Sequence, residues 1–140
     1  YLFKFFPLVN AAGGVVFNQK GEVLFIKRKN KWEFPKGKLG KNEEILDGAL
    51  REVAEETGVK DLMVKKRLIE TYHVFSKSGT YRLKKTYWFS MKTNYDGPLM
   101  PQVEENITDV VWKRLDEAPK LMENTYENVK ILFDKIKRSG

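Results

Sequence analysis

The chain has 140 residues, no cysteine, and 26 Lys and Arg against 19 Asp and Glu, a formal net charge of +7. This length suits one domain with its own core, and the lack of cysteine excludes disulfides, thiolate metal sites and cysteine nucleophiles. No apolar run approaches the roughly 20 residues that a bilayer crossing needs, so we expect a soluble, cytoplasmic protein whose charge favours polyanions.

The N-terminal segment is apolar, but it is interrupted by Lys4 and has neither a basic leader nor a small-residue cleavage site, which argues against a signal peptide. The first residue is Tyr1 rather than Met. We expect one domain over residues 1–140, either a processed product or one domain of a longer chain.

Two strands open the predicted fold, over residues 9–17 and 23–28, because both runs are rich in β-branched and aromatic residues. The turn signal at 18–21 between them indicates a hairpin. A short extended piece at 32–34 comes next and stops at Pro35, and a loop with two glycines leads onward.

A helix is predicted over residues 43–57. Asn42 is a good N-cap, acidic residues occupy the first turn, and Gly58 supplies a left-handed stop. Its apolar positions recur at helical spacing and form one buried stripe, made of Ile45, Leu46, Ala49, Leu50 and Val53.

Strands over 62–75, 80–91 and 107–112, a loop over 94–106 and a helix over 116–138 complete the chain. Strands before and after a central helix, with a second helix at the end, predict the α/β class, with α+β character: a mixed central sheet in an α/β/α sandwich.

Three carboxylates crowd one patch of the central helix. Glu52, Glu55 and Glu56 stand at i, i+3 and i+4, so their Cβ atoms lie only about 5 to 6 Å apart and repel one another unless a cation intervenes. Several oxygens there suit a hard divalent ion such as Mg²⁺. The segment 27–41 just before the helix is strongly basic, as a site for a metal-bound phosphate chain requires.

The 23 residues from Gly37 to Val59 resemble the Nudix box, GX5EX7REUXEEXGU with U aliphatic. All nine specified positions match, namely Gly37, Glu43, Arg51, Glu52, Val53, Glu55, Glu56, Gly58 and Val59. The resemblance implies an enzyme that hydrolyses a nucleoside diphosphate linked to another moiety. It also implies Mg²⁺, with Mn²⁺ as an alternative, held by Glu52, Glu55, Glu56 and the backbone carbonyl of Gly37, while Arg51 has a structural role.

A further acid is expected near the metal, as in many Nudix enzymes. Glu105 or Glu104 lies in the loop before the last strand and is a candidate general base or ligand. Loop glutamates also occur simply as solvated charges, and His73, the only histidine, is expected to be a strand residue without a catalytic role.

The flanking residues bear on the substrate. The stretch WEFPKG, residues 32–37, is similar to the diadenosine polyphosphate hydrolase branch, in which the lysine beside the box glycine faces phosphate; Lys36 is the matching residue, and Lys38 is a second candidate. Lys85 and Tyr87 are similar to that branch's lysine and aromatic pair, although the branch more often has a spacing of four. The candidates for adenine stacking are Tyr87, Tyr81 and Tyr126, each of which also suits a core.

We therefore expect a Mg²⁺-dependent pyrophosphohydrolase acting on a dinucleoside polyphosphate such as Ap4A. The alternatives are hydrolysis of ADP-ribose or another nucleotide sugar, of an oxidised nucleoside triphosphate, or of an RNA 5′ end. A nucleotide-sensing regulator without catalysis and a plain nucleic-acid binder are competing classes. The first commonly loses box glutamates, which this chain keeps, and the second rests on charge alone.

Overall fold

The computed structural model describes residues 6–139. Its strands are β1 (Leu8–Phe17), β2 (Val23–Arg28), β3 (Lys31–Glu33), β4 (Lys36–Lys38), β5 (Met63–Lys77), β6 (Thr80–Lys92) and β7 (Ile107–Lys113). Its helices are α1 (Ile45–Thr57), α2 (Ala118–Leu121) and α3 (Glu127–Ser139), with short 3₁₀ turns η2 (Val103–Glu105) and η3 (Met122–Asn124).

A mixed seven-stranded sheet runs through the molecule in the order β3-β2-β1-β6-β5, with β4 paired to β1 and β7 paired to β2. The β1–β6 pair is parallel over its whole length, whereas the other pairs are antiparallel. The second edge of β1 is divided, since it pairs with β4 through Ala11–Gly13 and with β2 only at Phe17. The hairpin expected between the first two strands is therefore reduced to one residue pair, Phe17 with Val23.

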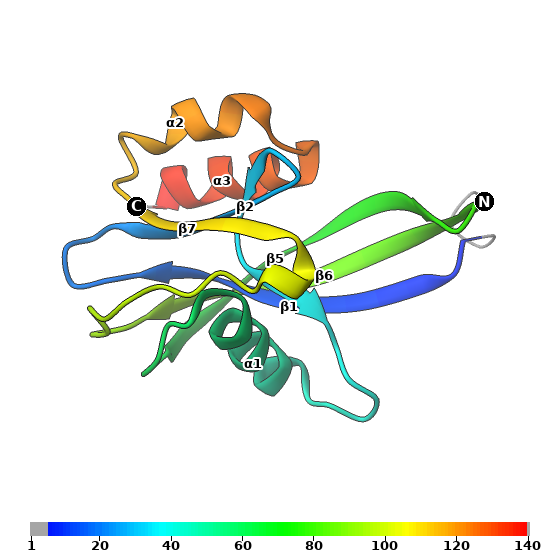
Figure 1. Ribbon diagram of the computed structural model, residues 1–140, viewed down its shortest axis with the longest axis horizontal. Helices are drawn as coiled ribbons and strands as arrows, with labels where there is room; N and C mark the ends of the chain where they lie inside the picture. The colour runs from blue at the N-terminus through cyan, green and yellow to red at the C-terminus, as the bar shows by residue number, and fades with distance from the viewer. Residues whose placement is uncertain (1–5, 140) are drawn as a thin grey trace.

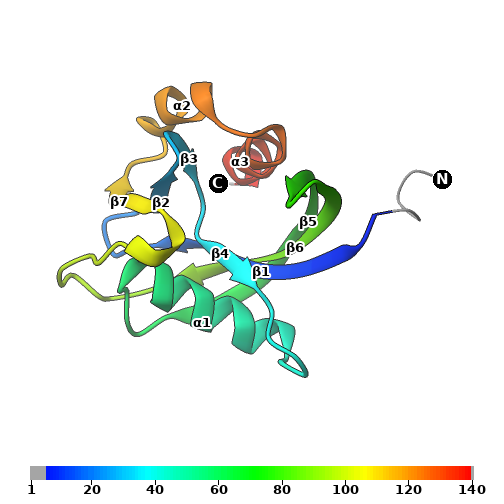
Figure 2. The ribbon, with the colours of Figure 1, turned by 45° about the vertical axis from the view of Figure 1, so that its right-hand side comes forward.

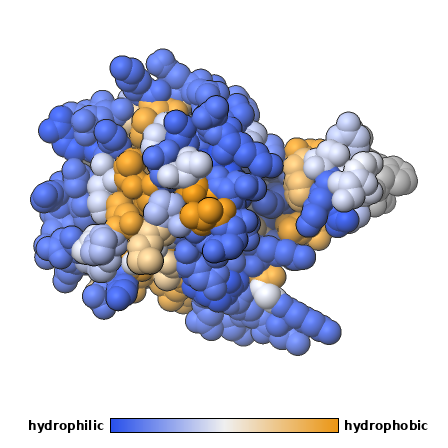
Figure 3. Space-filling model, in the orientation of Figure 1, coloured by the Kyte–Doolittle hydropathy of each residue, from blue (hydrophilic) through white to orange (hydrophobic). Residues whose placement is uncertain are grey.

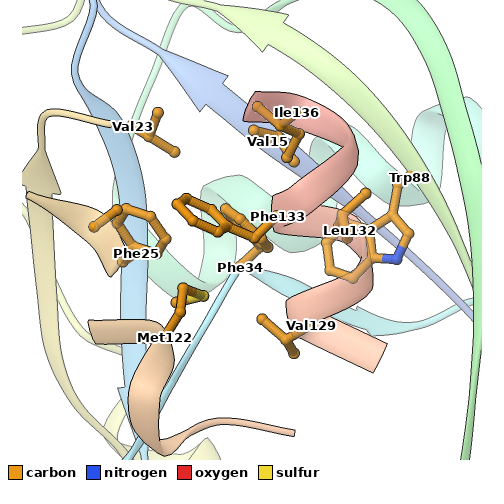
Figure 4. Packing of buried hydrophobic residues seen from close by; sticks show 11 residues of the cluster. Val15, Val23, Phe25, Phe34, Trp88, Met122, Val129, Leu132, Phe133 and Ile136 are labelled. Atoms are coloured by element: carbon orange, nitrogen blue, oxygen red, sulfur yellow. The ribbon is translucent and has the colours of Figure 1, made fainter. Parts of the chain in front are cut away.

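Helices cover both faces of this sheet, with α1 on one side and α2 and α3 on the other (Figures 1 and 2). Under α1, Ala49 and Val53 pack on Ala12, Val16 and Met91. On the opposite face, α3 directs apolar side chains at the sheet (Figure 4), namely Val129, Leu132, Phe133 and Ile136. The predicted mixed sheet in an α/β/α sandwich is thus confirmed.

Residues 35–36, which lead into β4, pass unusually close to β1. Gly13 permits this approach, because a Cβ there would collide with the carbonyl oxygen of Pro35, and the Gly14 N–H donates to that oxygen at 3.1 Å. The loop predicted from residue 36 accordingly begins as strand β4, held against β1. This places Gly37 under α1.

Two helix boundaries differ from the sequence prediction. The first helix begins at Ile45 with Glu44 at the N-cap, while Asn42 adopts a left-handed φ of 64° in the preceding loop. The helix predicted over 116–138 is broken, because Thr125 is extended and its hydroxyl donates to the carbonyl oxygen of Trp32. Gly58 ends α1 with a φ of 79°, as expected.

The hairpin of β5 and β6 extends beyond the helices at one end of the molecule (Figure 1). Its two-residue turn has positive φ at Ser78 (53°) and Gly79 (78°), the geometry that matches the twist of paired strands. The viewed surface is mostly hydrophilic, with apolar side chains gathered at its middle and on the projecting end (Figure 3). None of the helices within residues 6–139 has the length and apolar character of a membrane span.

Candidate active site

Helix α1, which carries the three box glutamates, lies directly over strand β4. Glu52 touches Gly37 so closely that a Cβ on Gly37 would collide with the Glu52 carboxylate, which explains why a glycine stands there. The Glu52 side chain is largely buried, and burial raises the pKa of its carboxyl. Arg51 opposes that rise, while the charges of Glu55 and Glu105 add to it.

Glu56 is the most deeply buried acid of the helix, with only 2% of its surface exposed. Its Oε1 accepts the backbone N–H of Lys36 at 2.9 Å, and its Oε2 pairs with Arg28 Nη2 at 2.9 Å. Burial raises the pKa of Glu56 to about 7, although Lys36 and Arg28 act to lower it. One hydrogen bond and one ion pair therefore leave much of its desolvation cost uncompensated.

Lys36 contacts a second acid, Glu33, besides Glu56, which accepts its backbone N–H. Its Nζ lies 3.0 Å from Glu33 Oε1, and both side chains are buried. Burial acts to raise the pKa of Glu33, but the neighbouring Lys36 and Arg28 outweigh it and hold that pKa below its ordinary value. The lysine beside the box glycine is thus fixed in place by Glu33.

Arg51 binds the remaining carboxylates. Its guanidinium donates to Glu43 at 2.7 and 2.9 Å, to Glu52 at 2.7 Å and to Glu55 at 2.9 Å. It also donates to the Lys38 carbonyl oxygen at 3.2 Å. The hydrogen bonds from Arg51, and then the Gly40 N–H, lower the pKa of Glu43 to about 2. These contacts suit the structural role predicted for Arg51, because they tie the loop after β4 to α1.

A cavity of about 310 Å³ opens beside these residues. Three acids line it, Glu52, Glu56 and Glu105. Six cations from four parts of the chain also line it: Arg28, Lys36, Lys38, Lys77, Arg82 and Lys84. Val9, Gly37 and Phe75 complete the wall.

The loop before β7 brings Glu105 to the cavity. The N–H of Met100 donates to the carbonyl oxygen of Thr57 at 2.8 Å, and that of Gln102 donates to the carbonyl oxygen of Glu56 at 3.3 Å. These bonds attach the loop to the C-terminal end of α1. Of the two loop acids predicted from the sequence, Glu105 lines the cavity, whereas Glu104 does not.

The substrate residues predicted on β6 lie elsewhere. Lys85 pairs with Glu70 at 3.4 Å and sits 5.0 Å from the centre of the Tyr87 ring. Tyr87 lines a neighbouring hollow, which shares Val9, Lys38 and Arg82 with the acidic cavity, but Tyr87 does not line the cavity itself. The neighbouring Lys84 faces the cavity, where burial and then the charges of Lys36 and Arg28 lower its pKa to about 8.

Three lining cations were missed from the sequence, namely Lys77, Arg82 and Lys84, and Arg28 was included only as part of the basic segment 27–41. Arg82 and Lys84 share one face of β6 by its two-residue period, the face opposite Lys85 and Tyr87. The sequence pattern does not show which face of β6 meets the cavity. Only the position of the β5–β6 hairpin relative to α1 decides it.

The three box glutamates do not converge on one point. Glu55 is turned outward with 45% of its side chain exposed, and Arg51 lies between it and Glu52. Across residues 6–139, no three acidic or histidine side chains form a ready-made metal site. Glu52 and Glu56 nevertheless share the cavity, offer hard oxygen donors and carry raised pKa values, so their chemistry fits a divalent cation. Gly37 lines the same cavity, and its carbonyl as a ligand stays a prediction.

Comparison with known proteins bears on the family of the chain. An RNA pyrophosphohydrolase of Pelagibacter ubique is 34% identical over 98 residues, which cover 61% of this chain and 62% of that protein. The chain thus spans a little under two thirds of that relative's length.

Solved structures match over nearly the whole chain. A C. elegans Ap4A hydrolase complex has a TM-score of 0.72 at 21% identity, covering 93% of this chain and 96% of its own. A MutT protein from Methanosarcina mazei has a TM-score of 0.73 at 22% identity, covering 96% of each chain. These likenesses establish the fold. The NUDIX domain model matches residues 7–133, so the family suggested by the box is confirmed: the chain belongs to the NUDIX domain family.

Proposed function

We propose that the protein is a Mg²⁺-dependent hydrolase that splits a phosphoanhydride in a nucleoside polyphosphate, with a dinucleoside polyphosphate such as Ap4A as the first candidate. One observation carries the proposal: three acids and six cations line a single cavity beside the Nudix-box helix. Acids at one wall suit a metal ion, and cations at the others suit a chain of phosphates.

The number of cations favours a long phosphate chain. Each phosphate of a bound chain carries charge that Arg and Lys can pair with. Arg28 and Arg82 each have a buried Nε–H with no hydrogen-bond partner among the described residues. A buried donor without a partner costs about 1–3 kcal/mol, and phosphoryl oxygens entering the cavity would remove that cost.

The acids divide the catalytic work between binding and proton transfer. Glu52 and Glu56 would hold the divalent ion, with the Gly37 carbonyl as a further oxygen donor. A bound Mg²⁺ acts as a Lewis acid on phosphoryl oxygen and lowers the pKa of a coordinated water. Glu105 lines the same cavity, close enough to Glu52 for its charge to help raise the Glu52 pKa, and it is exposed, so it can accept a proton and release it to solvent.

A nucleoside can stack beside the phosphate site. Phe75 lines the cavity, and the His73 ring stands parallel to it with the ring centres 6.4 Å apart. Tyr126 leans on His73 at 4.9 Å, and Lys31 lies over the Tyr126 ring. Half-buried aromatic rings with adjacent cations are suitable surfaces for a base. We propose Phe75 for this contact in place of Tyr81, which is 61% exposed.

A second candidate substrate is the 5′-triphosphate end of RNA. The curated relative from Pelagibacter ubique bears the name RNA pyrophosphohydrolase, which supports this candidate. The same cavity serves both substrates, since each presents a nucleoside on a chain of three or more phosphates. The two substrates differ in what else is attached. Ap4A carries a second nucleoside at the far end of the phosphate chain, whereas the RNA end carries the rest of the RNA strand on its nucleoside.

The deciding experiment compares turnover of Ap4A, 5′-triphosphorylated RNA, ADP-ribose and 8-oxo-dGTP with Mg²⁺, with products separated by chromatography. We expect kcat/KM to be highest for Ap4A, or for the RNA end if the second candidate holds. Preference for ADP-ribose would contradict the long-chain argument. Tight nucleotide binding without any hydrolysis would support a regulator instead.

Two matched variants test the role of the cations. Lys84→Met removes a charge that lines the cavity, whereas Lys120→Met removes one on the exposed surface of α2. We expect Lys84→Met to raise KM for Ap4A about tenfold or more, the effect of about 1.4 kcal/mol of lost binding, with a smaller effect on ADP-ribose. Equal effects of both variants on both substrates would refute the assignment.

A further inference from the structure

A second, larger hollow lies along the seam between α3 and strand β5, and none of the site glutamates lines it. Its volume is about 560 Å³. Its apolar wall is formed by Val15, Phe17, Leu68, Ile69, Met91, Leu132 and Ile136. It shares no lining residue with the catalytic cavity, so the proposed reaction does not account for it.

An irregularity in β5 forms this groove. The pairing of β5 with β6 shifts between Val64 and Lys66 and again between Arg67 and Glu70, so that Leu68 and Ile69 have no partner on β6. These two side chains pack partly buried against the core under α3. Bulges of this kind bend a strand and redirect its side chains.

The outer edge of β5 is free as well. This strand is the last in the sheet order and pairs only with β6 in the part of the chain that the structure describes. Such an edge carries a row of unpaired backbone N–H and C=O groups, which can pair with another extended segment. The groove therefore lies next to a surface that recognises backbone.

The rim of the groove is basic. Lys65, Lys66, Arg67 and Lys92 are exposed residues of its lining, and no Asp or Glu is among the lining residues. Arg67 pairs with Glu70 at 3.1 Å. The three lysines give this end of the groove a positive field that complements acidic groups.

The seam continues past this groove. A hollow of about 300 Å³ lies along the same two elements and includes Tyr72 and Ile131, which are 51% and 49% exposed. Glu70 and Glu127 also line it, so we expect the acids of a bound segment only at the Lys65 end and apolar residues here. From Lys65 to Tyr72 the strand has eight residues, which at about 3.3 Å each span roughly 25 Å. An extended segment of six to eight residues would cover this length.

We propose that the seam of α3 and β5 binds an extended segment of a partner protein in which apolar residues alternate with Asp or Glu. Its backbone adds to the free edge of β5, its apolar side chains enter the groove beside Leu68 and Ile69, and its acids meet Lys65, Lys66 and Lys92. A fatty acid would fill the groove but leave the strand edge unpaired. An RNA strand would meet the lysines but has no backbone amides to pair with β5.

The test begins with a random 12-residue peptide library displayed on phage and selected on the purified full chain. An enriched peptide is then synthesised with a fluorescent label, and its Kd is measured by anisotropy. We expect enriched peptides to alternate aliphatic or aromatic residues with Asp or Glu. Backbone amide NMR shifts on binding should centre on β5 and α3. Enrichment of peptides without acids, or no enrichment, would overturn the proposal.

Matched variants locate the contact. We expect the double variant Lys65→Glu with Lys66→Glu to raise the peptide Kd at least tenfold, and Lys120→Glu on α2 to change it less than twofold. Turnover of nucleotide should stay unchanged in both variants, which shows that each is folded. Equal affinities in the two variants would refute the site. Amide shifts in β5 that appear with a 12-nucleotide RNA or with palmitate, but not with peptide, would also refute it.

Discussion

The Glu56→Gln variant gives a sharp test of the buried site. Glu56 lies at 2% exposure between Arg28 and the Lys36 N–H, and burial raises its pKa from an ordinary 4.5 to about 7. Gln has nearly the same shape but stays neutral at every pH. The substitution therefore removes the cost of a buried charge while keeping the volume of the side chain.

The size and sign of the effect follow from proton linkage. An acid whose pKa is higher in the folded state destabilises the fold as pH rises from its unfolded pKa, here 4.5, to its folded pKa, about 7. At about 1.4 kcal/mol for each pKa unit, the full effect is about 3 kcal/mol. Without metal, the free energy of unfolding of Glu56→Gln should rise by that amount relative to the parent between pH 4.5 and pH 8.

Urea unfolding of both proteins in EDTA, at half-unit steps between pH 4.5 and 8, measures this difference. The ion pair with Arg28 is already part of the folded pKa of Glu56, and any pH-independent offset from altered hydrogen bonds cancels in the comparison. Added Mg²⁺ should stabilise the parent at pH 8 and leave the variant nearly unchanged, because a bound cation compensates the Glu56 charge. Parallel stability curves across this pH range would refute the reasoning.

Three further variants test neighbouring features. Glu52→Gln should lower turnover about 100-fold or more with an unchanged circular dichroism spectrum; turnover equal to that of the parent would contradict its role. Gly37→Ala should displace the Glu52 carboxylate and reduce kcat at least about tenfold. Gly40→Ala should leave kcat unchanged, because a Cβ at that position would meet only Glu43 atoms, at 3.3 Å or more. Similar losses of kcat in both variants would count against the close contact between Gly37 and Glu52. Thr71→Val should cost about 1–3 kcal/mol of unfolding free energy by leaving the Trp88 indole N–H without its 2.8 Å partner; in denaturant melts Thr71→Ser, which keeps the hydroxyl, should remain near the parent.

Local signals predicted much of the fold. Gly58 ends α1 in the left-handed conformation expected of it, and the Ser78–Gly79 turn lies in the gap between the two long strands predicted over 62–75 and 80–91. Both depend on the conformational needs of a few adjacent residues. The break near Thr125 was not predictable in this way, because the extended residue is held by the carbonyl oxygen of Trp32, far away in sequence.

The candidate site, too, was only partly predictable from local sequence signals. The box spacing brought out Glu52, Glu55 and Glu56, and their place on one helix follows from its period. That Glu56 is buried while Glu55 is half-exposed depends on where α1 lies on β4. Periodicity limits which residues share a face, but packing decides which face meets the cavity.

The β6 strand illustrates this limit. Lys85 fitted a family pattern from sequence, yet its partner is Glu70, and Lys84 lines the cavity in its place. Arg28 belongs to the basic segment 27–41, but nothing in the sequence singled it out or paired it with Glu56, which lies 28 residues away. Pairs of this kind appear only once the fold is known.

Isothermal titration calorimetry of Mg²⁺ into the purified protein, alone and with a non-hydrolysable Ap4A analogue, tests the central claim most directly. The parent should bind Mg²⁺, and the double variant Glu52→Gln with Glu56→Gln should show no binding heat while remaining folded. No uptake of Mg²⁺ by the folded parent in either condition, or equal uptake by parent and double variant, would contradict a metal-assisted hydrolase built on these two glutamates.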